Sequence, residues 1–250
     1  MTGIRAPQLT VCDDAEGVAE HVAGLIEARL SSNPWLRLGL ATGATPRPIY
    51  ARLVEAYRAG RIRFAHAASF NIDEYVGLGS GDPASFHAYM EEALFAHIDL
   101  RESARHIPDG LADDPDEEAA RYEALIAGCG GIDLQLLGLG RNGHIGFNEP
   151  GSPLDCRTRR VRLAASTRVD NARDFPAGTS VPEEALTMGI ATLLSAREIV
   201  LATTGPAKAR ALAVALQGPV TEAVPASALQ THGRVQVVCD REAAMLLRER

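Results

Sequence analysis

The chain has 250 residues, of which 46% are hydrophobic and 23% are charged, and its formal net charge is −7. This composition is typical of a soluble globular protein, and the negative charge argues against nucleic-acid and anionic-membrane partners, which both need a positive field. No apolar stretch approaches the roughly 20 residues of a membrane span, and residues 1–10 lack the apolar region of a secretory signal.

Helical patterns and short apolar runs alternate along the chain. We expect helices at residues 15–30, 46–57, 85–97, 117–127, 206–216 and 241–248. We expect strands at residues 36–40, 68–72, 132–137, 198–203 and 234–239. This order predicts an α/β fold with a doubly wound, mostly parallel sheet and helices on both faces, Rossmann-like, in a single domain over residues 1–250.

Ligands of such sheets bind beyond the carboxyl ends of the strands, so the segments that follow the strands are candidates for function. Four segments qualify, at residues 41–46, 71–75, 138–150 and 204–208. The least regular stretch, residues 151–182, is long for a connection, and we expect it to act as a lid or a binding segment.

The segment after the first of these strands contains Thr42, Gly43, Ala44 and Thr45, and it opens a helix at Pro46. Free amides and partial positive charge at a helix start suit a phosphate group. Gly43 lets the backbone approach a ligand, and a threonine hydroxyl adds a donor. The alternative is a plain turn with a threonine cap.

A carboxylate pair, Asp73 and Glu74, follows the second strand. Such a position suits a general base; the alternative is a pair of solvated acids in a turn.

The glycine-rich segment at residues 138–150 contains GxGxxG but lacks the following helix and the acid about 20 residues on that a dinucleotide site needs. We expect a tight loop that holds His144 and Glu149 as an acid–base pair, with a purely structural histidine as the alternative. The sequence has no HExxH motif and no clustered His/Cys set, so we expect no metal. Its four cysteines form no CxxC pair, which predicts reduced thiols in a cytoplasmic protein.

Cationic residues lie near two of these segments. Arg168 and Arg173 fall in the irregular stretch, and Lys208 opens a helix after a strand. A lysine is disfavoured in a first helical turn unless an anion binds there, so Lys208 is a phosphate candidate, with a solvated surface lysine as the alternative.

Taken together, these segments resemble the glucosamine-6-phosphate deaminase (isomerase) family, collinearly from about residue 36 to residue 240. The most specific motifs are NIDEY at residues 71–75 and NGHIGFNEP at residues 142–150. The resemblance implies conversion of glucosamine 6-phosphate into fructose 6-phosphate and ammonia, in N-acetylglucosamine catabolism, with an amino-sugar phosphate as the small-molecule partner and without a cofactor.

The resemblance also implies residue roles. Asp73 would move the proton from C2 to C1 through a cis-enolamine, His144 would open the sugar ring, and Glu149 would orient His144. The family's remaining ring-opening position falls on Asn142, which cannot ionise and can only hydrogen-bond.

The implied phosphate site comprises Gly43, Ala44 and Thr45 together with Arg173 and Lys208. Hexameric family members carry an allosteric site, of which one basic position matches Arg159 but the next falls on Val161. We therefore expect a monomer or a homo-oligomer without that regulation.

Three other functions remain as alternatives. A galactosamine-6-phosphate deaminase differs only in the C4 stereochemistry of its substrate. In 6-phosphogluconolactonases the corresponding loop lacks the Asn-Glu-Pro ending found at residues 148–150. A sugar-phosphate-sensing domain of a transcription regulator normally follows a helix-turn-helix, whereas residues 1–35 predict one helix.

Overall fold

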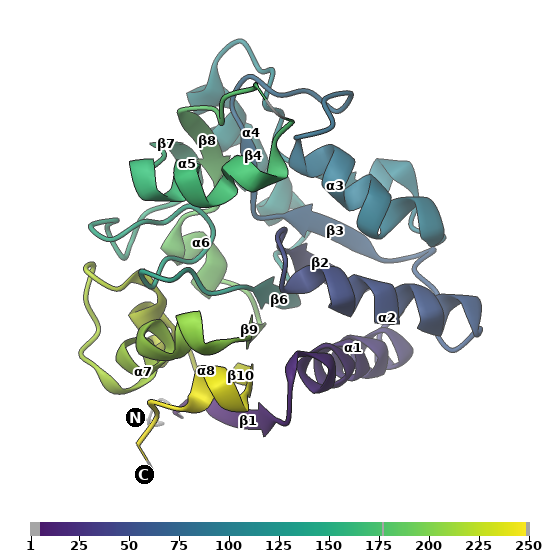
Figure 1. Ribbon diagram of the computed structural model, residues 1–250. Helices are drawn as coiled ribbons and strands as arrows, with labels where there is room; N and C mark the ends of the chain where they lie inside the picture. The colour runs from purple at the N-terminus through teal and green to yellow at the C-terminus, as the bar shows by residue number, and fades with distance from the viewer. Residues whose placement is uncertain (1–5, 177, 249–250) are drawn as a thin grey trace.

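A seven-stranded parallel sheet forms the centre of the computed structural model, which describes residues 6–176 and 178–248 (Figure 1). Its order is β1-β10-β9-β6-β2-β3-β5, and neighbouring strands within it pair in parallel. The strands are β1 (Gln8–Cys12), β2 (Arg37–Leu40), β3 (Ala68–Asn71), β5 (Arg105–His106), β6 (Leu134–Leu137), β9 (Glu198–Thr203) and β10 (Val235–Asp240).

The strand order reverses between β2 and β6. From β2 the chain proceeds outward through β3 and β5, then returns to the other side of β2 and proceeds through β6, β9 and β10. The connections at such a switch point diverge, and they leave a crevice at the carboxyl ends of the two strands. The segments that follow β2 and β6 therefore border the same crevice.

Helices cover both faces of this sheet, so the doubly wound prediction is confirmed (Figure 1). One face packs on α1 (Ala15–Ser32), α2 (Pro46–Arg58) and α3 (Phe86–Ala93). The other face packs on α4 (Pro115–Gly128), α6 (Ile190–Leu194), α7 (Ala209–Gln217) and α8 (Arg241–Ala244). Alternate residues of β9 enter the two cores, Val200 on one side and Leu201 on the other, as the two-residue period of a strand requires.

Local sequence fixes where several helices start. The side chains of Asp14, Ser85 and Asp114 each accept a hydrogen bond from a backbone N–H in the first turn of α1, α3 and α4. Each such cap contributes about 1 kcal/mol to helix stability. Pro115 follows its cap at a position where the missing N–H costs nothing.

A second, antiparallel sheet of three strands lies beyond β3, at the top of Figure 1. Its order is β4-β8-β7, with β4 (Asp73–Tyr75), β7 (Arg159–Arg162) and β8 (Glu184–Thr187). Tyr75 anchors it, because its ring packs against Phe86, Phe147 and Phe175 with centroids 4.7, 5.5 and 5.3 Å away.

The predicted irregular stretch at residues 151–182 is wrong in part, since it contains β7 and the helix α5 (Ala165–Asn171). The strand escaped prediction because three of its four residues are arginine and alternate residues face solvent. The predicted helix at residues 241–248 is also too long, as α8 ends at Ala244. Within residues 6–176 and 178–248, no helix combines the length and the apolarity needed to cross a membrane.

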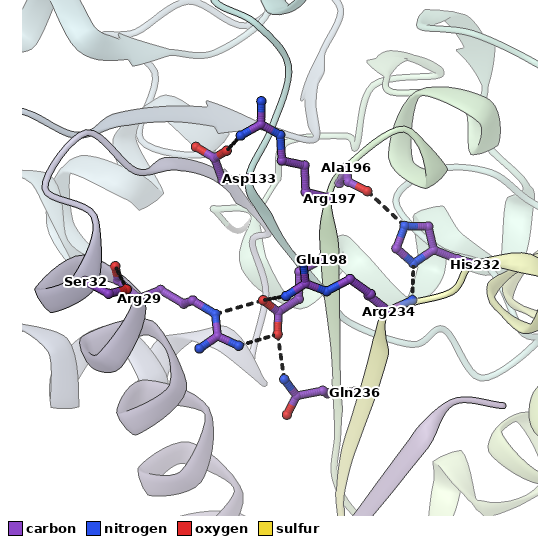
Figure 2. Close-up of polar contacts among 9 residues, drawn as sticks. All are labelled: Arg29, Ser32, Asp133, Ala196, Arg197, Glu198, His232, Arg234 and Gln236. Carbon is purple, nitrogen blue, oxygen red and sulfur yellow. Dashed lines mark hydrogen bonds and ion pairs between the residues drawn. The ribbon is translucent and has the colours of Figure 1, made fainter. Parts of the chain in front are cut away.

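The amino ends of the central strands carry ion pairs between arginines and two buried carboxylates (Figure 2). Glu198 accepts hydrogen bonds of 2.8 and 2.9 Å from Arg29, and Arg234 lies 3.6 Å away. Asp133 is 2.7 Å from both Arg37 and Arg197. We call this group the amino-end ion pairs; it faces away from the crevice.

Candidate active site

Asp73 occupies β4, where the small sheet meets the crevice. Its residue is only 6% exposed, and burial, followed by the charge of Glu74, raises the pKa of its carboxyl well above the usual value. Within residues 6–176 and 178–248, no group donates a hydrogen bond to this carboxyl. A buried carboxyl without donors gains proton affinity, which suits a general base.

Gly146 brings the backbone of the loop at residues 138–150 against Asp73. Its φ is +55°, and a Cβ there would lie 3.6 Å from the Asp73 Oδ2 atom and 2.7 Å from the Ile72 side chain. The neighbouring Phe147 N–H donates to the Thr187 hydroxyl on β8 at 3.1 Å. A glycine is therefore needed at residue 146 to seat this loop beside the carboxyl.

His144 lies in the same loop, paired with Glu149. Its Nδ1 is 3.5 Å from Glu149 Oε2, and its side chain is 26% exposed. The ring lies against Gly140, where a Cβ would come within 2.4 Å of three ring carbons. The His144 backbone N–H donates to the side chain of Asn142 at 3.2 Å. These contacts fix both the ring and the loop that holds it.

Two further donors surround Glu149. Asn142 Nδ2 donates to Oε2 at 2.7 Å, and the Thr167 hydroxyl of α5 donates to Oε1. Burial acts to raise the pKa of Glu149, but the nearby His144 and the hydrogen bonds from Thr167 and Asn142 outweigh it and lower the pKa to about 2. Glu149 is therefore a permanent anion at neutral pH that can stabilise positive charge on His144.

Glu74 has a different role from its neighbour. Its carboxylate accepts backbone hydrogen bonds from Tyr75, Phe86 and His87 at 2.8 to 3.0 Å, and thereby ties β4 to the start of α3. Burial raises the pKa of Glu74 to about 7 although these hydrogen bonds act to lower it. Of the predicted carboxylate pair, only Asp73 has a carboxyl without donors.

The segment after β2 has the open backbone expected of an anion site. Gly43 adopts a φ of +108°, and no atom lies within 4 Å of where its Cβ would be. Its carbonyl accepts from Tyr89 Oη at 2.7 Å, which fixes the turn. Thr45 is the N-cap of α2 yet makes no side-chain cap hydrogen bond, and Ala44 is exposed. The first amides of α2 and the hydroxyl of half-buried Thr42 adjoin the same turn.

A cluster of cations lies near the start of α7. Lys208 is half-buried at the N-cap of α7, and burial lowers the pKa of its ammonium. The nearby charges of Arg141 and Arg173 lower that pKa further, whereas Asp170 raises it. Arg173 and Lys208, the two cations predicted for the phosphate, thus interact electrostatically, and Arg168 pairs with Glu183 at 3.2 Å.

The family of the chain follows from comparison with known proteins. The family model for glucosamine-6-phosphate isomerases and 6-phosphogluconolactonases matches residues 13–238. The chain belongs to this family. A glucosamine-6-phosphate deaminase of Rhodopirellula baltica is 50% identical over 250 residues, which span 100% of each chain. A solved monomeric glucosamine-6-phosphate deaminase superposes with a TM-score of 0.93 at 45% identity, over 96% of this chain and 99% of that one.

The family also contains more distant structures of the same fold. The 6-phosphogluconolactonase of Trypanosoma cruzi superposes with a TM-score of 0.75 at 22% identity, over 99% of each chain. Asn148, in the loop ending at residues 148–150, is buried. It donates to the Met188 carbonyl at 2.8 Å and accepts from Arg159.

Sequence reasoning did not predict three features of this candidate site, namely the role of Glu74 as a structural acceptor, Thr167 as a partner of Glu149, and Arg141 near Lys208. Thr167 gave no signal, since its contact with Glu149 depends on how α5 packs. Arg141 did give a signal, because it is a cation within a glycine-rich loop and lies three residues before His144. No group of three metal-ligating side chains exists among the described residues.

Proposed function

We propose that this chain converts glucosamine 6-phosphate and water into fructose 6-phosphate and ammonia. The observation that carries the proposal is one arrangement of three parts. A buried Asp73 carboxyl without hydrogen-bond donors lies beside the loop that holds the His144–Glu149 pair, and a cluster of cations lies nearby. The names and the 45–50% identity of the deaminases compared above support this reaction.

Ring opening would come first. His144 transfers a proton to the ring oxygen as the bond between C1 and that oxygen breaks, and the C1 hydroxyl gives up its proton to leave the aldehyde. Anionic Glu149 stabilises the charge that His144 carries during the transfer. Asn142 holds Glu149 by donating to it, which orients the carboxylate without adding a second titrating group.

Isomerisation and loss of ammonia would follow on the open chain. Asp73 removes the proton from C2 of the amino aldehyde, which gives an enolamine with a double bond between C1 and C2. The same carboxyl returns the proton to C1, and the nitrogen becomes an imine at C2. Water adds to that imine, and its collapse releases ammonia and leaves the C2 ketone. A carboxyl whose pKa burial has raised accepts a carbon-bound proton more readily than a solvated one.

The phosphate group would bind at the start of α2 and at the cations. Gly43, Ala44 and Thr45 offer amides and a hydroxyl, and Arg173 and Lys208 offer positive charge. Holding the phosphate there fixes the sugar carbons relative to Asp73 and His144.

We also propose that residues 1–250 act as one domain and that the protein is a monomer of the cytoplasm that serves amino-sugar catabolism. The monomeric state of the deaminase with the TM-score of 0.93 supports the proposal of a monomer, as does Val161 at the allosteric position. The absence of CxxC pairs fits a reducing compartment.

Ammonia release tests the function. Wild type and Asp73→Asn are assayed for ammonia release from glucosamine 6-phosphate and galactosamine 6-phosphate, and for hydrolysis of 6-phosphogluconolactone to the acid. Asp13→Asn, which replaces an exposed carboxylate that follows the edge strand β1 and pairs with Arg241, is the charge-matched control. We expect turnover of glucosamine 6-phosphate, lost in Asp73→Asn and kept in the control. Turnover of the lactone alone, or full activity of Asp73→Asn, would refute the proposal.

A further inference from the structure

The helix α5 packs on the rest of the protein through one buried side chain. Thr167 is 5% exposed, and among the seven residues of α5, all of which the structure describes, it is the only buried one. Its neighbour Ser166 is exposed. Burying a hydroxyl without a hydrogen-bond partner costs free energy, so a threonine at this position calls for a partner.

The partner of this hydroxyl is the carboxylate of the acid–base pair. Thr167 Oγ1 donates to Glu149 Oε1, a side chain 18 residues earlier in the sequence. The hydroxyl of a threonine inside a helix often donates to a backbone carbonyl one turn earlier, whereas this hydroxyl is directed at another segment. The contact therefore joins α5 to the loop that holds His144.

The two oxygens of Glu149 are held by different donors. Asn142 Nδ2 donates to Oε2 at 2.7 Å, while Thr167 holds Oε1. The last torsion of a glutamate is soft, so a carboxylate held at one oxygen can still rotate, and a second donor restricts that rotation. Oε2 lies 3.5 Å from His144 Nδ1, whereas a charge-assisted hydrogen bond is about 2.7–2.9 Å long. A small rotation of the carboxylate therefore decides whether it can close on the imidazole.

We infer that Thr167 is a positioning residue for the acid–base pair, whose hydroxyl holds Glu149 so that Oε2 faces His144. The inference rests on the proposed function for the reaction that the pair performs. Thr167 acts through Glu149 and need not touch the substrate. Its donation also favours the anionic carboxylate, since it is one of the contacts that lower the pKa of Glu149 to about 2.

Two substitutions separate the hydroxyl of Thr167 from its shape. Thr167→Val keeps the branched side chain and removes the donor, whereas Thr167→Ser keeps the donor and removes a methyl group. Ser166→Ala removes an exposed hydroxyl from the adjacent position of the same helix and is the matched control. Circular dichroism checks the fold of each variant.

The first measurement is kcat and KM for ammonia release from glucosamine 6-phosphate. We expect Thr167→Val to lower kcat about 10- to 100-fold, the usual worth of a hydrogen bond to a charged group, with KM within about twofold of wild type. Thr167→Ser should keep most of the wild-type kcat, and Ser166→Ala should match wild type. In the Glu149→Gln background, Thr167→Val should change kcat by less than about twofold, because the group through which Thr167 acts has lost its charge.

A different kinetic pattern would refute the inference. Arg173, predicted to bind the phosphate, follows α5 by two residues, so Thr167→Val could instead disturb substrate binding. That disturbance would raise KM and leave kcat unchanged. An equal loss of kcat with and without Glu149 would likewise show that Thr167 does not act through this carboxylate.

The second measurement needs no turnover. Carbon-13 NMR of protein with labelled glutamate follows protonation of Glu149 between pH 7 and pH 3, and the signal is assigned by its absence from Glu149→Gln. We expect more protonation at pH 3 in Thr167→Val than in wild type, Thr167→Ser or Ser166→Ala, because the anion has lost a donor.

This measurement separates the inference from the proposed function. If wild type releases no ammonia but Glu149 protonates more readily in Thr167→Val, the proposed function fails and the role of Thr167 stands. If wild type is active and Thr167→Val matches Ser166→Ala both in kcat and in the titration of Glu149, the role of Thr167 is refuted and the proposed function stands.

Discussion

Replacing Glu149 by glutamine keeps the size of the side chain but removes the charge that His144, Thr167 and Asn142 surround. The nearby His144 and the hydrogen bonds from Thr167 and Asn142 lower the pKa of Glu149 from 4.5 to about 2 in the folded protein. One pKa unit corresponds to about 1.4 kcal/mol, so the ionised carboxylate contributes up to roughly 3 kcal/mol to the free energy of unfolding at neutral pH. The side chain is 16% exposed, so solvent screens it only in part.

The pH dependence follows from the direction of this change. A depressed folded-state pKa contributes stability that is present above the unfolded value of 4.5 and is lost as pH falls toward 2. Between pH 7 and pH 3 the contribution falls by about 2 kcal/mol. The free energy of unfolding of Glu149→Gln should therefore lie below that of wild type at pH 7 and approach it at pH 3.

Urea unfolding at pH 7, 5, 4 and 3 measures this difference. Glu92→Gln, which replaces an exposed carboxylate 71% accessible to solvent, is the control and should track wild type at every pH. A difference between Glu149→Gln and wild type that stays constant from pH 7 to pH 3 would show that charge is not what the variant removes. The same variant should release ammonia far more slowly than wild type, because His144 loses its anionic partner.

Three further expectations follow from the site. Asp73→Asn should lower ammonia release by about 10²- to 10⁴-fold while calorimetric phosphate binding stays at the wild-type value. Gly140→Ala should lower kcat without unfolding the chain, because its Cβ would lie 2.4 Å from the ring of His144 and must displace it; circular dichroism checks the fold. Because the pKa of Glu74 is raised to about 7, its ionisation should lower the free energy of unfolding of wild type as pH rises from 4.5 through 7. Thermal melts of Glu74→Gln should show a smaller fall in melting temperature over that range.

The parallel core was predictable from sequence because its strands are short apolar runs bounded by turn residues. Strands β6 and β9 consist almost wholly of buried residues, and such runs have few other interpretations once helices flank them. The convergence of Asp73, His144 and Glu149 could be expected for the same reason, since each follows a strand of one sheet.

The small sheet could not be predicted, because its strands are three or four residues long and β7 reads Arg-Arg-Val-Arg. The sequence also could not show which of Asp73 and Glu74 has the carboxyl without hydrogen-bond donors. Neighbouring residues of a strand point to opposite faces, so their environments depend on the register of β4 against β8. Arg141 has no periodicity to mark it, and only the position of α5 brings Asp170 to it.

The amino-end ion pairs, part of which Figure 2 shows, lie at the amino ends of the strands, whereas the catalytic loops follow the carboxyl ends. The six residues of β9 separate the two ends by roughly 20 Å, more than twice the screening length of about 8 Å at physiological ionic strength. Charges added or removed at Arg197 or Arg234 are therefore screened from Lys208. The isoelectric point and the melting temperature can be adjusted at that end, and a tether or a fused domain attached there leaves the entrance for substrate unobstructed.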